Sequence, residues 1–215
     1  MYNTATAFLE ALRETGVSHL FANLGSDRQA LIESLAEARA EGVSVPRLIT
    51  CPNEMVALSA AHGYAQVAGQ PQAVIVHVEC GTQALAGAVH NAAKGRTPVL
   101  IFAGMSLIAQ AGELPGSRNE FIHWLQDVND RRAIVRQYMH YDNEIRTGVN
   151  VKQLVYRTSA REVPGAGSAA DDAEPFARGG ETSPVQRITQ DLAWWFAPST
   201  RVPVSSMCCH GAESP

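Results

Sequence analysis

One carboxylate stands out among the residues that could do chemistry. Glu54 begins the stretch 54–67, EMVALSAAHGYAQV, which is largely apolar and alanine-rich and contains no further Asp, Glu, Lys or Arg. The helix dipole favours an acidic residue in a first turn, and this is the simpler interpretation of Glu54. A carboxylate that is partly removed from water can also hold or exchange a proton near neutral pH. Glu54 is therefore the candidate catalytic residue.

The cysteines and histidines give weaker signals. Cys51, Cys80, Cys208 and Cys209 have no CxxC spacing, and the seven histidines form no HExxH motif. The sequence CCH at 208–210 is a weak metal signal, so we expect no metal site in this chain. Unpaired thiols are typical of an intracellular protein, and we expect a cytoplasmic location.

The composition indicates a globular protein and argues against nucleic-acid-binding and membrane-spanning classes. Hydrophobic residues make up 46% of the chain and charged residues 18%, which is typical of a packed globule. The net charge of -4 and the lack of a basic stripe indicate no nucleic-acid partner. Apolar runs such as AVIVHV are too short to span a bilayer, and residues 1–16 form an amphipathic pattern rather than a targeting peptide.

The elements that must position Glu54 alternate between helix and strand over residues 1–157. Continuous apolar strands between amphipathic helices indicate an α/β fold, with a mostly parallel, flavodoxin-like sheet and helices on both faces. A short helix and one more strand are expected within residues 119–145. The other predicted helices are 4–16, 26–42, 54–67, 82–95 and 148–157, and the other predicted strands are 18–25, 46–51, 72–79 and 97–104.

Four loops follow the predicted strands. Their sequences are NLGSD, CPNE, ECGT and AGMS. Ligands bind at the carboxyl ends of strands in such sheets, so these loops are the candidate walls of a site. None contains GxGxxG, a P-loop or GxSxG, which argues against a Rossmann dehydrogenase or a serine hydrolase.

The character of the chain changes after Arg157. Residues 158–215 are rich in Gly, Ser, Ala and Pro without a sustained period, and we expect a largely disordered tail. A helix-like piece, VQRITQDLAWWFA, interrupts this tail at 185–197. The predicted organisation is one domain at 1–157 followed by a low-complexity tail.

The ordered motifs of the first domain resemble a known family. Glu54 is followed by GYA at 63–65, Gly69, GTQ at 81–83 and a PVLIFAG strand at 98–104. This combination is similar to the N-terminal, pyrimidine-binding domain of thiamine diphosphate-dependent enzymes, in the acetolactate synthase-like branch. The resemblance covers about residues 3–157.

The resemblance implies thiamine diphosphate as the cofactor and a 2-oxo acid as the substrate of a decarboxylase or carboligase. Glu54 would hydrogen-bond N1′ of the aminopyrimidine and favour the imino tautomer, which removes the C2 proton of the thiazolium. The implied cofactor-binding residues are Asn23, Gly25, Ser26, Glu54, Cys80, Gly81, Thr82, Gln83 and Gln126.

The chain departs from the family pattern in two motifs. The chain has VECGT where relatives have a glycine pair, and it contains no GDG motif for Mg²⁺ and the diphosphate. Mg²⁺ would therefore be bound only by a domain that this chain lacks. A homo-oligomer or a full-length relative would have to supply that domain.

Three alternatives follow from these departures. The chain can be an inactive fragment that associates with full-length relatives, or another flavodoxin-like ligand-binding domain in which Glu54 is only a dipole-favoured acid. The tail resembles foreign sequence joined near Thr158, as a frameshift or alternative splicing would produce.

Overall fold

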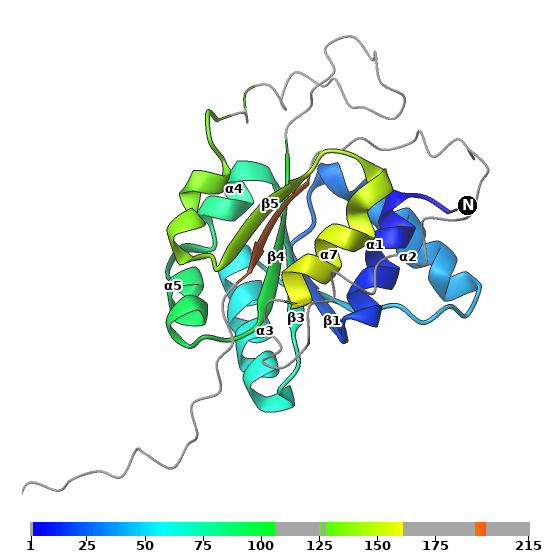
Figure 1. Cartoon of the computed structure of the whole chain (residues 1–215), viewed down its shortest axis with the longest axis horizontal. Helices are drawn as coiled ribbons and strands as arrows, with labels where there is room; N and C mark the ends of the chain where they lie inside the picture. Colours follow the sequence, from blue (N-terminus) through cyan, green and yellow to red (C-terminus); the bar gives the residue numbers. More distant parts are fainter. Residues whose placement is uncertain (1, 106–124, 126–127, 161–191, 197–215) are drawn as a thin grey trace, which may run out of the picture.

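The structure, a computed structural model, describes residues 2–105, 125, 128–160 and 192–196 (Figure 1). One sheet runs through the middle of the molecule with the strand order β2-β1-β3-β4-β6-β5. Strands β1 to β4 pair in parallel, and β6 pairs antiparallel with both β4 and β5. The prediction of a mostly parallel α/β sheet is confirmed. The strands are β1 (His19–Ala22), β2 (Arg47–Thr50), β3 (Gln72–Val76), β4 (Val99–Gly104), β5 (Tyr141–Ile145) and β6 (Leu192–Phe196).

Helices cover both faces of this sheet, as predicted (Figure 1). Alternate strand residues point to opposite faces, so Ala73 and Ile75 pack with α1 and α7, whereas Val74 and Val76 pack with α3 and α5. The stacked rings of Phe8 and Phe102 anchor α1 on β4. The α-helices are α1 (Thr4–Glu14), α2 (Gln29–Ala40), α3 (Glu54–Ala68), α4 (Val78–Gln83), α5 (Ala86–Lys94) and α7 (Val151–Ala160), and the 3-10 helices are η1 (Ser26–Arg28), η2 (Arg132–Ile134), η3 (Arg136–Tyr138) and η4 (Gly148–Asn150).

The ends of α3 follow directly from its sequence. The side chain of Asn53 accepts a hydrogen bond from the backbone N–H of Val56 at 2.9 Å, which caps the first turn. Gly69 ends the helix with φ +66°, a left-handed conformation that favours glycine. The helix therefore begins at Glu54, where the sequence predicts it, and holds this residue at the edge of the sheet.

Two predicted elements differ in detail. The strand predicted at 72–79 ends at Val76, and the expected ECGT loop is instead the short helix α4. The helix predicted at 82–95 is divided, because the chain turns at 84–85 and Ala86 has φ +42°. Residue propensity does not reveal such a break, since alanine favours helices.

The predicted tail contributes to the sheet. Helix α7 continues across the predicted boundary at residue 157 and ends at Ala160, and β6 lies between β4 and β5. The helix-like interpretation of 185–197 is wrong for Leu192–Phe196, which form a strand because both neighbouring strands offer backbone partners. The rest of the tail, including the predicted disorder, lies outside the described residues.

Candidate functional site

Glu54 lies at the edge of the sheet where the parallel strands end. Only 6% of its surface is exposed. Its Oε1 accepts a hydrogen bond from Nδ2 of Asn23, in the loop after β1, at 3.1 Å. Buried carboxylates need hydrogen-bond donors, and Asn23 therefore orients this one.

Gly81 packs tightly against this carboxylate. A Cβ atom at position 81 would lie 2.9 Å from Oε1 of Glu54 and 3.3 Å from the backbone carbonyl carbon of Val76. Both distances are tighter than ordinary van der Waals contact, so the absence of a side chain is required for the close approach of α4 to Glu54. The structure thus brings together Asn23, Glu54 and Gly81 from the predicted set.

The other predicted residues of the first loop lie nearby in a different environment. Gly25 is covered by the ring of His77, and a Cβ atom on Gly25 would lie 2.2 Å from Nδ1 of that ring. Ser26 begins η1 and is exposed. Gly25 therefore contacts a second group of polar residues, whereas Ser26 faces solvent.

The predicted residues of α4 divide by burial. Thr82 is buried, and its hydroxyl donates to the carbonyl oxygen of Val78 at 2.7 Å, so it stabilises the helix itself. Cys80 and Gln83 are exposed. Partial burial and the charge of Glu79 raise the pKa of the Cys80 thiol, so this thiol is a poor nucleophile.

A second cluster at the same edge was not predicted from the sequence. Asp27 accepts from Nδ1 of His77 at 2.7 Å and lies 3.3 Å from the guanidinium of Arg28. Arg28 donates to the carbonyl oxygen of Val76, and its guanidinium lies 4.8 Å from the ring centroid of Phe102. The side chains of Asp27 and Arg28 are 7% and 2% exposed. A partial signal existed in the sequence, because Asp27 follows the predicted strand 18–25 and His77 lies near the end of the predicted strand 72–79.

The electrostatics of this cluster favour an ionised Asp27. Burial by itself would raise the pKa of Asp27, but the charge of Arg28 and the hydrogen bond from His77 lower it below its ordinary value. Burial also lowers the pKa of Arg28, while Asp27 opposes that change. A guanidinium nevertheless stays charged, because its ordinary pKa lies far above neutral pH.

Two further features show how tightly this edge is built. A Cβ atom on Gly104, at the end of β4, would lie 2.0 Å from Oδ2 of Asp27. Val78, directly after His77, has φ +25°, which is a costly conformation for a β-branched residue. Strained backbone of this kind is concentrated at functional sites, typically at a cost of about 1–3 kcal/mol. Position 78 therefore joins the candidate site.

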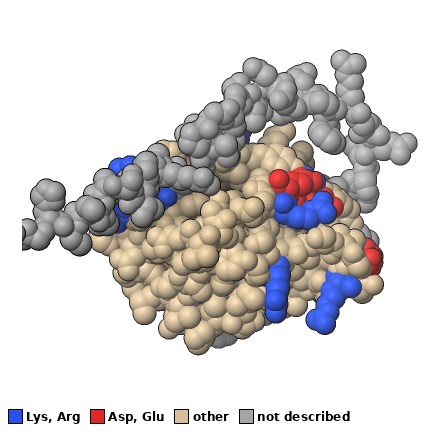
Figure 2. All heavy atoms as spheres, turned by 90° about the horizontal axis from the view of Figure 1, so that it is seen from below, with Lys and Arg blue, Asp and Glu red and all other residues tan. Residues whose placement is uncertain are grey.

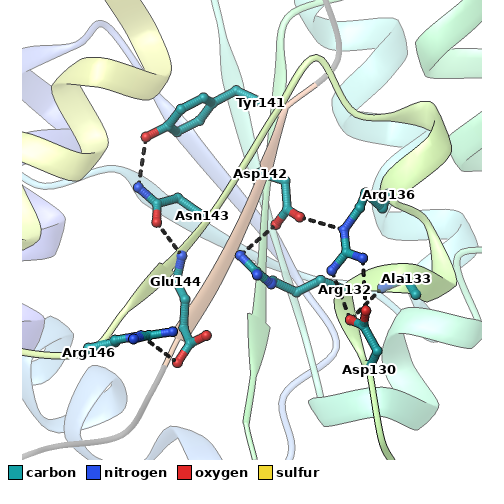
Figure 3. A network of polar contacts seen from close by, with 9 residues as sticks. All are labelled: Asp130, Arg132, Ala133, Arg136, Tyr141, Asp142, Asn143, Glu144 and Arg146. Atoms are coloured by element: carbon teal, nitrogen blue, oxygen red, sulfur yellow. Dashed lines mark hydrogen bonds and ion pairs between the residues drawn. The ribbon is translucent and has the colours of Figure 1, made fainter.

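A separate ionic network lies on the surface beside β5 (Figure 3). The guanidinium of Arg136 donates two hydrogen bonds to Asp130, both at 2.8 Å, and its Nε donates to Asp142 at 2.9 Å. Arg132 lies 3.4 Å from the same Asp142. The hydrogen bonds from Arg136 lower the pKa of Asp130. This network joins η2 and η3 to β5.

Three expectations concern features away from Glu54. Gln126 lies outside the described residues, so its role stays a prediction. Within residues 2–105, 125, 128–160 and 192–196, no helix is long and apolar enough to cross a bilayer. In the same described ranges, no three His, Cys, Asp or Glu residues are grouped so that they could hold a metal ion.

The family becomes clear when the chain is compared with known proteins. A family model described as "Thiamine pyrophosphate enzyme, N-terminal TPP binding domain" matches residues 2–134, more than half of the chain. The chain belongs to this family. The matched range of the thiamine pyrophosphate domain contains both polar clusters at the edge of the sheet, that of Glu54 and that of Asp27.

A curated relative is also similar to this thiamine pyrophosphate domain. The "Putative acetolactate synthase large subunit IlvX" of Mycobacterium tuberculosis is 34% identical over 104 residues. The match covers 47% of this chain and 19% of the relative. The chain therefore spans about a fifth of the length of this relative.

Solved structures share the fold. The Rhodococcus jostii RHA1 thiamine diphosphate-dependent 4-hydroxybenzoylformate decarboxylase matches with a TM-score of 0.60 and 19% identity, covering 74% of this chain and 27% of that chain. A structure described as "a putative thiamin diphosphate-dependent enzyme isolated from Mycobacterium smegmatis" has the same TM-score and 20% identity, covering 75% of this chain and 28% of its own. At these identities the likeness is one of fold.

Proposed function

We propose that this chain binds thiamine diphosphate through the aminopyrimidine ring, as part of a decarboxylase or carboligase that acts on 2-oxo acids. The family and the acetolactate synthase-like relative support this reaction class. When bound, the cofactor would supply a carbon nucleophile that attacks the 2-oxo group. The chain's own contribution is to hold and polarise the aminopyrimidine.

The observation that carries this proposal is the buried carboxylate of Glu54, held by Asn23 at the edge of the sheet. A carboxylate at this depth can accept a hydrogen bond from a protonated ring nitrogen and hold the proton there. Asn23 fixes one carboxylate oxygen at 3.1 Å. The missing side chain at Gly81 lets the backbone of α4 approach this carboxylate closely. Glu54 thus offers a fixed, buried hydrogen-bond acceptor to a protonated ring nitrogen.

The diphosphate and Mg²⁺ would be held by a domain from a second subunit, either a copy of a longer protein or a full-length relative. Helix α3 has no charged residue after Glu54, and its outer face exposes Met55, Val56, Tyr64 and Val67. Figure 2 shows the other end of the molecule, because it is seen from below whereas β4 ends and α4 lies at the top of Figure 1; Lys, Arg, Asp and Glu are sparse there too. The uncharged outer face of α3, which begins at Glu54, suits a partner that completes the site.

Replacing Glu54 tests the proposal. In an assembly reconstituted with a relative that supplies the diphosphate-binding domain, we expect Glu54→Gln to slow exchange of the cofactor C2 proton by about 10²–10⁴-fold, the usual contribution of acid–base catalysis. Glu79→Gln is the matched control, because Glu79 is a buried carboxylate in the adjacent helix α4. An unchanged exchange rate in Glu54→Gln, or an equal loss in both variants, would show that the assigned role is wrong.

The second candidate is an inactive fragment that associates with full-length relatives. The chain covers 19% of the curated relative and 27–28% of the two solved chains, and it contains no GDG sequence for the diphosphate. The isolated chain would then bind the cofactor at best with a millimolar Kd, since about -4 kcal/mol corresponds to 1 mM. Co-purification with a relative, without a gain in turnover, would support this function over the first.

A further inference from the structure

We propose that helix α4 (Val78–Gln83) is a conformational switch, which closes the site in this structure and moves away from Glu54 when an aminopyrimidine ring binds. This inference rests on the proposed function, because that ring is the ligand for which the helix makes room. Figure 1 shows α4 at the edge of the sheet where β4 ends. A movement of this helix would therefore control access to Glu54.

The carboxylate of Glu54 is covered from two sides in this structure. Nδ2 of Asn23 lies 3.1 Å from Oε1, and a Cβ atom on Gly81 would lie only 2.9 Å from the same oxygen. Because 6% of Glu54 is exposed, little of its carboxylate is accessible to a flat ring. Asn23 fixes the carboxylate through a hydrogen bond, whereas Gly81 only packs against it. Helix α4 is thus the element that can withdraw.

Strained backbone flanks α4 at both ends. Val78, its first residue, has φ +25°, and Ala86, shortly after its last residue, has φ +42°. These left-handed values are costly for residues that have a Cβ atom. Two of the three non-glycine residues with positive φ in the described part of the chain therefore flank this one short helix. Strain of this kind is typical of switch regions, because a second arrangement of the chain can release it.

A buried polar atom also favours a second position of α4. Oε2 of Glu79 is buried, and it has no hydrogen-bond partner in the part of the chain that the structure describes. An unpaired buried carboxylate oxygen destabilises the arrangement that buries it. A movement of α4 that opens this oxygen to water removes that cost.

The sequence itself favours a different path for this segment. Residues 82–95 have a helical pattern and alanine is the best helix former, yet the chain turns at 84–85. A helix of six residues without a side-chain cap is not stable alone, so packing holds α4 in place. If Ala86 were right-handed, α4 would continue directly into α5 (Ala86–Lys94), which changes the direction of α4 relative to Glu54. We take this continuous helix as the open form.

Ala86→Gly tests the switch through affinity. Ala86 is exposed, so glycine removes the strain without loss of packing and stabilises the closed form. A ligand that binds only the open form then binds more weakly, because a smaller fraction of the chain is open. We expect the Kd for thiamine diphosphate to rise about fivefold, which corresponds to about 1 kcal/mol, the lower end of the cost of a left-handed residue. Arg96→Gly is the matched control, because Arg96 has φ +49° but lies after α5, and this variant should have the Kd of the wild-type chain.

The backbone of Ala86 reports the movement itself. In the ¹³C,¹⁵N-labelled full chain without ligand, the ¹³Cα and ¹³Cβ shifts of Ala86 should be those of a left-handed residue. Thiamine diphosphate at millimolar concentration should move them toward right-handed helical values, and it should shift the side-chain amide signal of Asn23, which contacts Glu54. The carbon shifts of Arg96 should stay unchanged. Titration of the Asn23 signal gives the Kd of each variant.

The two signals separate failure of the switch from failure of the proposed function. A shift at Asn23 with unchanged carbon shifts at Ala86 would overturn the switch, while the proposed function stands. Equal Kd values for Ala86→Gly and the wild-type chain would also overturn it. So would right-handed Ala86 shifts in the ligand-free wild-type chain, even if Ala86→Gly fails to fold. No shift at Asn23 would contradict the proposed function and the switch together.

Discussion

Two ionic networks in this molecule use similar residues in opposite surroundings. Asp27 and Arg28 are buried beneath Phe102 and beside Gly104, and they hold His77. In the surface network of Figure 3, Arg136 and Asp130 have side-chain exposures of 41% and 49%. The geometry of the surface network is the better of the two, because Arg136 binds Asp130 through two short, parallel hydrogen bonds.

The comparison shows that hydrogen-bond geometry alone does not determine how much an ion pair contributes to the stability of the fold. An exposed pair gains little, since water screens the charges and the side chains lose freedom. A buried pair has lost the water around both charges, so removing one partner leaves the other charge unpaired. We therefore expect the buried cluster, with its poorer geometry, to dominate both stability and function.

The largest expected effect comes from Arg28→Ala. This change leaves Asp27 buried without its cation, and we expect it to lower the free energy of unfolding by about 3–5 kcal/mol. Denaturation of the full chain by urea measures the loss. Arg39→Ala, on the exposed face of α2, is the matched control and should change little. If both variants lose the same free energy of unfolding, the buried pair does not contribute more to stability than an exposed arginine.

Gly104→Ala tests how tightly the buried cluster is packed. The new Cβ atom would lie 2.0 Å from Oδ2 of Asp27, and we expect a loss of about 1–3 kcal/mol from overpacking. Gly87→Ala in α5 is the control, because a Cβ atom there meets no other atom within 4 Å. The control should be neutral or should stabilise the chain by about 0.4–1 kcal/mol. A stable Gly104→Ala protein would mean that Asp27 is not held where the structure has it.

The pH dependence of stability separates the wild-type chain from Asp27→Asn. The pKa of Asp27 is lowered from its ordinary 3.8, so its contribution is present above that value and is lost as the pH falls through the lower pKa of the folded state. We expect the wild-type free energy of unfolding to fall below about pH 4 with up to about 1.4 kcal/mol per pH unit from this one group. Urea denaturation at several pH values measures the slope. If the free energy of unfolding of Asp27→Asn falls with pH as steeply as that of the wild type, Asp27 does not cause the pH dependence.

The smallest expected effect is that of Arg136→Ala. The surface network is open to solvent, and we expect a midpoint of urea denaturation close to that of the wild-type chain at physiological salt. The same measurement at low salt should enlarge any difference. A loss as large as that of Arg28→Ala would break the comparison, because it would give the exposed pair the weight of a buried one.

The sequence was sufficient to predict the helix that begins at Glu54 and the first four strands along the chain, whereas the role of Glu54 stays a prediction. An uncharged helix behind a single acid, with Asn53 as its cap, is a local signal that does not depend on the rest of the fold. The apolar strands likewise show their burial in their composition. Local patterns of this kind predict both the element and the side of the sheet on which the site lies.

The Asp27 cluster could not be predicted in the same way. Strands β1 and β3 pair in parallel, with Ala22 opposite Ile75, so the residues after each strand meet at one edge. That register brings Asp27 to His77 across 50 residues of sequence. The break near Ala86 was missed for a similar reason, because the packing of α4 and α5 outweighs the propensity of alanine.

The place of β6 in the sheet has a consequence for synthesis. Strand β6 lies between β4 and β5, and each of these two strands forms its ladder with Leu192–Phe196. A growing chain therefore exposes the edge of β4 until almost ninety further residues have left the ribosome. Unpaired strand edges are where nascent chains associate wrongly. Completion of the sheet therefore depends on a segment that is made well after the two strands it joins.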